Sequence, residues 1–517
     1  MGYYDEFIQA IVSGDVTTRD AVLRLKARLC RRHGLSRVPT NYEILAHVPE
    51  GLREVVEPLL RNKPVRTISG VAPVAVMTSP YECPHGRCSY CPGGVANNSP
   101  QSYTGREPAA LRAAMNDFDP HRQTSSRLEQ LRAIGHRTDK VDLIVMGGTF
   151  TSRPEDYQEW FVKRCFDAMN RQESRDIAAA HSLNEAAPSR CVGLTVETRP
   201  DWFAADQIDT SMRLGATKVE FGVQILDDAV LDGVKRGHRV DAVVEATARA
   251  KDAGLKVCYH VMPGLPGSSR EKDLASFARM FEDPRFRPDM LKIYPTLVVK
   301  GTGLHGQWER GEYAPLSVEE GVSLLAEMKS MVPPYVRILR IQRDIPAHLI
   351  EAGIRKGHLR ELVAERMSAE GRACGCIRCR EVGHLGVDAS DRATEPGLRS
   401  VAYDASGGRE VFLSFESEGR GSLVGYARLR LPGGGSDHAF VRELHVYGQM
   451  VPIHGEPGAK WQHRGFGERL LAECERLASS EGRPELRVTS GVGVRGYYRA
   501  LGYERRGHYM AKPLGGP

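Results

Sequence analysis

Three cysteines fall within nine residues of the stretch Cys83-Pro84-His85-Gly86-Arg87-Cys88-Ser89-Tyr90-Cys91-Pro92-Gly93-Gly94. Pro84 and the Gly93-Gly94 pair bend the backbone, so that the three thiols can converge on one centre. Three thiolates are one fewer than a closed structural zinc site or a fully ligated iron–sulfur cluster requires. A [4Fe–4S] cluster that is bound by three cysteines keeps one iron open for an exogenous ligand. The stretch therefore predicts an open cluster held by Cys83, Cys88 and Cys91.

An open iron suits an enzyme whose cluster binds and reductively cleaves S-adenosylmethionine (SAM). The spacing is Cys-x4-Cys-x2-Cys, which is one residue longer in the first gap than the commonest spacing of radical-SAM enzymes. A zinc knuckle that takes His85 as its fourth ligand is the alternative interpretation of these residues.

The length and composition of the chain exclude several classes. A chain of 517 residues is too long for one core and should divide into about three domains. No apolar run is long enough for a membrane span, and the acidic start lacks the apolar region of a signal peptide. The cysteines cluster at metal-like spacings, which favours a reducing cytoplasm over a disulfide framework. A net charge of +6 is compatible with a nucleic-acid partner.

Residues 1–66 are predicted to be helical, because apolar residues recur there at helix spacing. Basic residues concentrate on and after one of these helices, and such a patch would meet phosphates through charge, independent of base sequence. The alternative is a basic face that only contacts solvent. The candidate RNA-binding residues are Lys26, Arg28, Arg31 and Arg32.

From residue 67 to 353, short apolar runs alternate with helix-like segments. Near-continuous apolar strands in βα alternation predict a parallel sheet that forms a barrel or partial barrel, with chemistry at the carboxyl ends of the strands. The cysteine loop directly follows the first of these strands. The predicted strands are 71–77, 142–146, 191–196, 218–223, 256–261, 290–294 and 336–341, with helices near 123–134, 155–170, 205–214, 227–235, 241–253, 270–282 and 317–330.

Polar groups and glycines at other strand ends are candidates for the SAM site. Gly147 and Gly148 end the second strand, where missing side chains would let a ligand reach the backbone, although such a pair is usually only a turn. Glu197 and Gln224 end the next two strands. Lys292 lies within a strand that should be buried, which predicts a polar barrel interior or, alternatively, a satisfied salt bridge in the core.

Residues 354–398 contain a second thiol cluster, Cys374-Gly375-Cys376-Ile377-Arg378-Cys379. With one histidine, Cys374, Cys376 and Cys379 would complete a closed, structural zinc site. Either His358 or His384 could be the fourth ligand. A second redox cluster is the alternative. A polar linker is expected near 385–398.

Residues 399–517 show a different pattern. Strand-like runs at 410–416, 422–431 and 440–446 precede Gln462-His463-Arg464-Gly465-Phe466-Gly467, which opens an amphipathic helix. This arrangement resembles the GNAT acetyltransferases, in which amide groups at the helix start bind the pyrophosphate of coenzyme A. A strand at 486–489 and a short helix with Tyr497 and Tyr498 follow. A tyrosine there can contact the thioester sulfur or protonate the leaving thiolate, so both tyrosines are candidate catalytic residues.

A radical-SAM barrel joined to a GNAT domain resembles the catalytic subunit of Elongator and its single-chain archaeal and bacterial relatives, the tRNA wobble-uridine acetyltransferases. The resemblance spans nearly the whole chain. The motifs that carry it include Tyr90-Cys91-Pro92-Gly93-Gly94, Val145-Met146-Gly147-Gly148-Thr149-Phe150, Glu197-Thr198-Arg199-Pro200-Asp201, Gln342-Arg343-Asp344-Ile345-Pro346 and Arg442-Glu443-Leu444-His445-Val446.

The resemblance implies modification of carbon 5 of the wobble uridine in the tRNA anticodon loop, with a [4Fe–4S] cluster, SAM and acetyl-CoA, to give 5-carboxymethyluridine or a precursor. In the implied mechanism a 5′-deoxyadenosyl radical takes hydrogen from the acetyl methyl group, the carbon radical adds to uracil, and thioester hydrolysis leaves the carboxylate. The implied acetyl-CoA contacts are Lys140, Glu443, Leu444, His445, Val446, Gln462, Gly465, Phe466, Gly467, Glu468, Arg469 and Tyr498.

The first cysteine gap and the Cys374–Cys379 cluster differ from the eukaryotic members. They indicate the single-chain type, which is compatible with a homodimer, rather than a subunit of a full Elongator assembly. Two other functions compete with wobble-uridine modification. A protein lysine acetyltransferase with the barrel as scaffold would need an acidic peptide groove and would work without iron or SAM. A tRNA-binding protein with a vestigial radical site is disfavoured by the intact cysteines.

Overall fold

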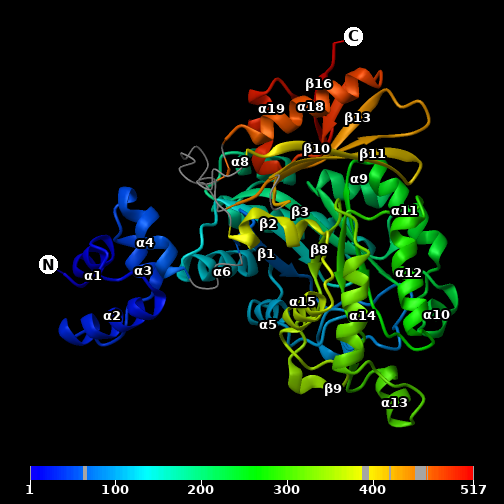
Figure 1. Cartoon of the computed structure of the whole chain (residues 1–517), viewed down its shortest axis with the longest axis horizontal. Helices are drawn as coiled ribbons and strands as arrows, with labels where there is room; N and C mark the ends of the chain where they lie inside the picture. The colour runs from blue at the N-terminus through cyan, green and yellow to red at the C-terminus, as the bar shows by residue number, and fades with distance from the viewer. Residues whose placement is uncertain are drawn as a thin grey trace.

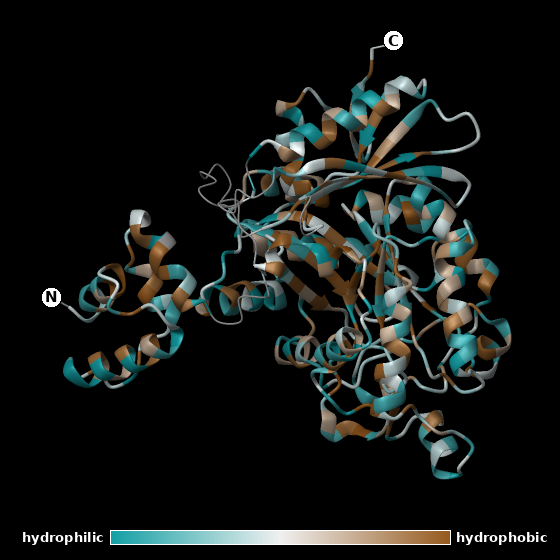
Figure 2. Cartoon of the chain, viewed as in Figure 1, coloured by the Kyte–Doolittle hydropathy of each residue, from teal (hydrophilic) through white to brown (hydrophobic). Residues whose placement is uncertain are grey.

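The computed structural model of this chain describes residues 2–61, 67–386, 395–417, 421–448, 461–462 and 464–515. Figure 1 shows a small helical unit at the N-terminus, a central sheet surrounded by helices, and a C-terminal sheet packed against one end of the central domain. In Figure 2 the strands of the central sheet are largely hydrophobic, whereas the outward faces of the helices carry more hydrophilic residues. No helix within these ranges is long and apolar enough to cross a membrane.

The N-terminal unit has a hydrophobic core of its own, which includes Phe7, Leu25, Ile44 and Val56. Threonine side chains cap α2 and α3 by accepting hydrogen bonds from backbone amides of the first turn. The helices are α1 (Tyr3–Val12), α2 (Arg19–Arg32), α3 (Asn41–Ala46) and α4 (Arg53–Leu60). The predicted helical segment is therefore present, and the end of its range, 62–66, lies outside the described residues.

The central sheet contains all seven predicted strands, and its ends differ from the predicted ones by at most two residues. Every neighbouring pair is parallel, in the order β1-β2-β3-β4-β5-β6-β8, so the carboxyl ends of the strands meet at one rim. β1 and β8 form the two edges of this partial barrel. The strands are β1 (Ala72–Met77), β2 (Lys140–Met146), β3 (Arg190–Thr198), β4 (Lys218–Gln224), β5 (Lys256–Val261), β6 (Met290–Ile293) and β8 (Arg337–Arg340).

Helices connect these strands and cover the sheet (Figure 1). The predicted set is present as α6 (Pro120–Ala133), α7 (Glu155–Asn170), α9 (Ala205–Arg213), α10 (Asp228–Gly233), α11 (Val240–Asp252), α12 (Arg270–Glu282) and α14 (Val318–Ser330). Three further helices have eight residues or fewer, which is too short to show a clear period in the sequence. They are α5 (Pro108–Met115), α8 (Ile177–Asn184) and α13 (Gly303–Glu309).

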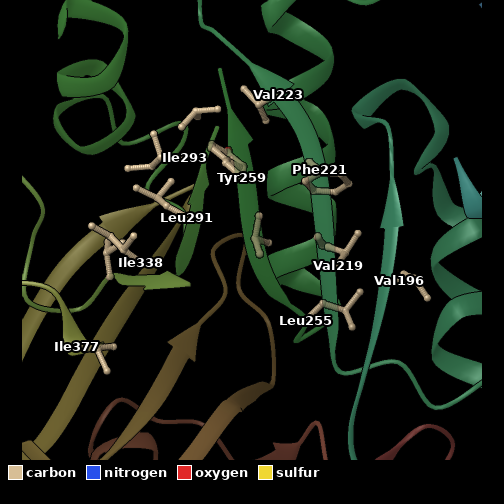
Figure 3. Close-up of a cluster of buried hydrophobic side chains, with 14 of the residues drawn as sticks. Val196, Val219, Phe221, Val223, Leu255, Tyr259, Leu291, Ile293, Ile338 and Ile377 are labelled. Carbon is tan, nitrogen blue, oxygen red and sulfur yellow. The ribbon is translucent and has the colours of Figure 1, made fainter. Parts of the chain in front are cut away.

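The two faces of the central sheet differ in polarity. Figure 3 shows Val219, Phe221 and Val223 of β4 among the buried apolar side chains of neighbouring strands, and all three are fully buried. Because side chains alternate along a strand, Lys218, Glu220 and Gln224 point to the opposite face, which is the interior of the partial barrel. This arrangement agrees with the predicted polar interior.

A short segment joins the central domain to the C-terminal sheet. It contains α15 (Leu359–Ala369), α16 (Ile377–Arg380) and α17 (Val382–Leu385), after a small pair of strands, β7 (Val298–Val299) and β9 (Ile350–Ala352). The predicted polar linker falls mostly on residues 387–394, which lie outside the described residues.

The C-terminal sheet has seven strands in the order β10-β11-β12-β13-β14-β16-β15. β13 and β14 are parallel but pair only from His438 to Val441, so residues 442–446 of β13 extend past β14. β10 was not predicted because most of its side chains are exposed and show no apolar alternation. The elements are β10 (Gly397–Ala405), β11 (Gly408–Glu416), β12 (Leu423–Leu431), β13 (His438–Val446), α18 (Phe466–Ser480), β14 (Glu485–Val488), α19 (Arg495–Ala500), β15 (Glu504–Arg506) and β16 (Tyr509–Pro513).

A buried ion cluster joins the C-terminal sheet to the amino ends of the central strands. Arg442 donates to both carboxylate oxygens of Asp289, just before β6, at 2.6 and 2.7 Å, and to Glu410 at 2.8 Å. Arg428 lies 3.6 Å from the same Asp289 carboxylate. The cluster balances Lys251, Arg428, Arg430 and Arg442 against Asp252, Asp289, Glu410 and Glu443. Every charge therefore has a partner of opposite sign at the interface.

We expect Asp289→Asn to destabilise the protein, because it keeps the shape but leaves Arg442 and Arg428 buried with one negative charge fewer. Removing one partner of a buried pair costs about 3–5 kcal/mol. The shift of the urea unfolding midpoint measures this effect. Glu245→Gln, in an exposed pair with Arg249 at 2.6 Å, is the matched control and should change stability by less than about 0.5 kcal/mol. Equal shifts in the two variants would contradict the assignment.

Candidate active site

A hollow of about 1010 Å³, including open solvent, lies at the carboxyl ends of the central strands. The cysteine loop after β1, the ends of β2 to β6 and the residues after β8 all contribute to its lining. Parallel strands bring these segments together although they are far apart in the sequence. The hollow is the place where the predicted cluster and SAM residues meet.

The three thiols of the cysteine loop line this hollow, and each has a polar neighbour. The Thr149 hydroxyl lies 3.5 Å from the Cys83 sulfur, and the Ser102 amide donates to the Cys91 sulfur at 3.3 Å. A guanidinium nitrogen of Arg236 lies 3.8 Å from the Cys88 sulfur. Hydrogen bonds and positive charge around cysteine sulfurs suit a cluster bound by thiolates.

The spacing of these thiols does not fit a zinc knuckle. Sulfurs bound to one tetrahedral zinc lie about 3.8 Å apart, because each Zn–S bond is about 2.3 Å long. Among the residues that the structure describes, Cys374, Cys376 and Cys379 lie within 4.8 Å of one another, whereas the three thiols of the cysteine loop form no such group. His85 lies 3.1 Å from the Cys88 sulfur. The wider spacing suits a cluster whose cysteines bind different irons.

Gly147 and Gly148 form a turn that only glycine can adopt here. Both have positive φ angles, 139° and 92°. A Cβ atom at Gly147 would lie 2.0 Å from the Thr78 hydroxyl, and one at Gly148 would lie 3.2 Å from the Cβ of Gln101. Gly148 lines the hollow, so its backbone is accessible to a ligand there.

Gln224 ends β4 with a φ of 72°, which is rare for any residue except glycine. Its Oε1 atom is buried and accepts no hydrogen bond from the described residues, although the residue lines the hollow. An unpaired buried acceptor costs free energy. Gln224 is therefore suited to accept a hydrogen bond from a ligand such as SAM.

Glu197 and Lys292 belong to a buried ion network. Lys292 forms an ion pair with Glu220 and lies 3.6 Å from Glu197, and Glu197 accepts a hydrogen bond from Tyr103 at 2.8 Å. Burial alone would raise the pKa of Glu220, but Lys292 and Lys218 hold this pKa well below its ordinary value. Both carboxylates line the hollow, so Lys292 acts on the site through them.

Arg236 is a site residue that was not predicted from the sequence. It is buried, and its guanidinium donates to the carbonyl of Gly222 as well as approaching Cys88. The neighbouring Gly237 has a φ of 77°, and a Cβ atom there would lie 2.7 Å from the Cβ of His85. A glycine within the basic run Lys235-Arg236-Gly237-His238-Arg239 is the sequence signal that could have indicated it.

The second thiol cluster has the spacing of a single-ion site. Cys376 is buried and precedes α16, while Cys374 and Cys379 are half-buried. Neither of the two candidate histidines belongs to the group of described residues within 4.8 Å. His384 lies 3.2 Å from Glu381 instead, and burial lowers its pKa to about 4. The three thiols lie close enough together to bind one metal ion, and the choice of His358 or His384 as fourth ligand stays a prediction.

The predicted acetyl-CoA motif is at the start of α18, where Gly465 has a φ of 78°. A Cβ atom at Gly467 would lie 3.0 Å from the Tyr497 hydroxyl. Gln462 donates to the Val446 carbonyl at 3.2 Å and accepts from Lys140 at 3.3 Å. Lys140 starts β2, so it reaches the motif because the C-terminal sheet packs on the amino ends of the central strands. His463 of the quoted motif lies outside the described residues.

Some of the remaining predicted acetyl-CoA contacts are engaged with other residues of the protein, and a second group is half-buried or exposed. Glu443 forms an ion pair with Arg428 of the same sheet at 2.8 Å, whereas His445 Nε2 lies 2.9 Å from the Ser69 carbonyl oxygen of the central domain. Phe466 is buried, and the guanidinium of Arg469 lies 4.5 Å from the ring centre of Phe415. The second group, Leu444, Val446, Gly465 and Glu468, is half-buried or exposed.

The two predicted catalytic tyrosines lie next to the motif in different environments. Tyr497 is 38% exposed, whereas Tyr498 is 6% exposed and packs against Tyr503. Burial raises the pKa of Tyr497 to about 12, and the negative charge of Glu468 adds to this effect. Tyr497 is therefore protonated at neutral pH and can donate a proton.

The basic residues of α2 are not equivalent. Lys26 is 6% exposed and donates to the side-chain oxygen of Asn41 at 2.7 Å, which corrects the prediction that it faces RNA. Arg28, Arg31 and Arg32 are exposed, and Arg32 forms an ion pair with Glu6. Helix spacing alone did not distinguish the buried lysine from the exposed arginines.

A second basic surface lies between the N-terminal helices and the central domain. It is a hollow of about 1410 Å³, including open solvent, and its residues come from several distant segments, so no local sequence pattern indicates it. Burial lowers the pKa of Arg132, and the positive charge of Arg171 adds to this effect. We call this surface the basic groove; its arginines are Arg53, Arg132, Arg137, Arg171 and Arg190, and Glu57 and Asp139 also line it.

Comparison with protein families agrees with this architecture. The family described as the radical SAM superfamily matches residues 78–278, and the Radical_SAM C-terminal domain matches residues 288–369. The ELP3 N-terminal domain matches residues 2–68. The partial barrel with its three-thiol loop is thus a radical SAM domain.

Individual relatives cover nearly the whole chain. The tRNA uridine(34) acetyltransferase of Methanocaldococcus jannaschii is 48% identical over 97% of this chain and 95% of its own length. Elongator complex protein 3 of Danio rerio is 43% identical over 98% of this chain and 96% of its own length. The solved structure of archaeal Methanocaldococcus infernus Elp3, with an N-terminal deletion, is 45% identical with a TM-score of 0.77, covering 87% of this chain and all of that one. The chain belongs to the family of tRNA uridine(34) acetyltransferases and Elongator complex protein 3, which confirms the predicted resemblance.

We expect Cys83→Ala, Cys88→Ala and Cys91→Ala each to prevent stable cluster formation, because each thiol holds a separate iron. Anaerobically reconstituted wild-type protein should carry about four irons per chain and cleave SAM. The matched control is Cys191→Ala, which removes a buried thiol outside both clusters and should leave iron content unchanged. SAM cleavage that persists in all three loop variants would contradict the assignment.

Proposed function

We propose that this chain is a radical SAM-dependent acyltransferase that modifies carbon 5 of the wobble uridine of tRNA. The proposed product is 5-carboxymethyluridine or a precursor, with acetyl-CoA as the carbon donor. One observation carries the proposal: a single chain holds both a hollow lined by three thiols and an acyl-CoA-type motif. A buried interface joins the two domains that contain them. The names of the relatives support the choice of tRNA uridine as substrate.

The proposed division of labour follows the fold. Residues 1–66 bind RNA, 67–353 carry the radical SAM site, 354–398 bind structural zinc, and 399–517 form a GNAT acetyltransferase domain. In this proposal the protein works in the cytoplasm. A protein lysine acetyltransferase would use the last of these units alone, and no observation on the described residues favours it.

At the radical site, Cys83, Cys88 and Cys91 would hold the cluster. When bound there, such a cluster would supply the electron for reductive cleavage of SAM. Gly148 opens the rim to the methionine part of SAM, and Gln224 offers an unpaired acceptor to its ammonium group. Glu197, held by Tyr103 and Lys292, provides a fixed negative charge beside them.

At the acyl-CoA site, the amide groups that start α18 would bind the coenzyme A pyrophosphate, since they have no partners within the helix. Residues 444–446 extend beyond β14, so their backbone can pair with the pantetheine arm as an added strand would. Lys140 and Gln462 close the other side. The Tyr497 and Tyr498 hydroxyls are the proposed proton donors to the leaving thiolate.

The two sites lie at opposite ends of the central strands. Lys140 and Met146 are the first and last residues of β2, and six residues at about 3.3 Å each separate the two ends by about 20 Å. The acetyl group therefore has to cover this distance to meet the uridine in the proposed reaction. The polar interior of the partial barrel lies between the two ends.

For the acyl-CoA site, we expect Gly467→Trp to weaken acetyl-CoA binding and to abolish uridine modification, because the indole would block the approach to the helix start. SAM binding and iron content should not change. Gly397→Trp is the matched control, since a side chain there meets nothing within 4 Å. Equilibrium binding and mass spectrometry of the wobble nucleoside provide the measurements. Carboxymethylation at the normal rate in Gly467→Trp would show that acetyl-CoA in this domain is not the carbon donor.

For the RNA-binding surfaces, we expect charge reversal to flatten the salt dependence of tRNA affinity. Removing one arginine–phosphate pair should reduce the slope by about 1. We expect this for Arg28→Glu with Arg31→Glu, and separately for Arg171→Glu with Arg190→Glu in the basic groove. Arg476→Glu, at an exposed position of α18, is the matched control. If the slope of tRNA affinity against salt is unchanged in either double variant, the surface that carries those two arginines does not bind tRNA.

A further inference from the structure

One part of the active-site hollow is not used by the cluster or by SAM in the proposed function. It is formed by the ends of the last two strands of the central sheet and by the segment after β8. Tyr294 follows β6, Arg340 ends β8, and Arg343 and Asp344 come next. All four line the same hollow as the three thiols.

The polar groups of this part are arranged as a donor beside an acceptor. Arg340 forms an ion pair with the Asp344 carboxylate at 2.6 Å, and the two side chains are 45% and 46% exposed. Arg343 is anchored differently, by a hydrogen bond to the Ser102 carbonyl, and its guanidinium lies 5.8 and 6.0 Å from the rings of Tyr103 and Tyr294. Asp344 therefore presents acceptors to the hollow next to the remaining donors of Arg340.

This pattern complements one nucleobase edge. The Watson–Crick edge of uracil has an N3–H donor between the acceptors O2 and O4, whereas cytosine has an unprotonated N3 acceptor next to an amino donor. An ionised carboxylate only accepts hydrogen bonds, so it pairs with N3–H of uracil and repels N3 of cytosine. A guanidinium beside it can donate to O4 or O2. Single-stranded bases are commonly read on this edge while an aromatic side chain stacks on the ring.

We propose that Asp344 and Arg340 read the Watson–Crick edge of the target uracil, with Tyr294 against the face of the ring. The inference rests on the proposed function and names the groups that select its substrate base. With N3 held at the β8 side, the C5–C6 edge on the other side of the ring turns toward the hollow that the thiols line. That is the orientation in which carbon 5 can be modified.

The test uses anticodon stem-loop RNAs that differ only at the wobble base, which is uridine, cytidine or 3-methyluridine. 3-Methyluridine replaces the N3–H donor with a methyl group and keeps both carbonyls. Wild-type protein with its cluster and SAM should bind the uridine loop about 10-fold or more tightly than either of the others. In Asp344→Asn the amide can turn its donor toward cytosine, so the preference for uridine over cytidine should disappear. In Asp344→Ala the uridine and 3-methyluridine loops should bind alike.

Glu312→Gln is the matched control, because Glu312 forms an exposed ion pair with Arg310 at 2.7 Å and does not line the hollow. It should keep the wild-type preferences, and all variants should keep iron content and SAM binding. An Asp344→Ala variant that still discriminates against 3-methyluridine as the wild type does would overturn the inference while leaving the proposed function intact. A wild-type protein that neither prefers nor modifies the uridine loop would overturn the proposed function, and the inference with it.

Discussion

The pairing of Arg442 with Asp289 is the constraint on which the arrangement of the two sheets depends. Both side chains are fully buried, and the arginine also binds Glu410 of its own sheet and the carbonyl of Leu255 in the central domain. Leaving either charge alone in the core would cost several kcal/mol, so the pair holds the C-terminal sheet in one position. Close backbone contacts reinforce it: a Cβ atom at Gly491 would lie 2.2 Å from the carbonyl oxygen of Val192.

This interface determines which ends of the strands each site occupies. The C-terminal sheet covers the amino ends of the central strands and brings Lys140 to Gln462, while the carboxyl ends remain open for the cysteine loop. Buried charges connect the two ends. Burial and the charge of Lys218 lower the pKa of Lys256 near the interface, and Lys292 and Lys218 lower the pKa of Glu220 near the hollow. The two proposed cofactors would therefore bind on either side of a polar interior.

The sequence predicted the elements of the fold better than the surroundings of individual side chains. Buried apolar residues recur in every central strand, which is a local signal, so all seven strands were found; β10 is mostly exposed and was missed. Gly147, Gly148 and Gly465 of the predicted motifs have positive φ angles, which favour glycine. Lys26 and Arg236 contact partners that are distant in the sequence, Asn41 and Cys88, and their local patterns do not identify these partners. The basic groove was not predicted either, because its residues come from segments that are distant in the sequence.

The central claim is that the two sites act on one carbon unit, and acetyl-CoA with a deuterated methyl group tests it most directly. The account predicts that 5′-deoxyadenosine gains one deuterium from that methyl group. The carboxymethyl group on the wobble uridine should then retain the other two deuterium atoms and both acetyl carbons. Unlabelled 5′-deoxyadenosine together with an unlabelled nucleoside would show that the carbon comes from elsewhere, and would contradict the account.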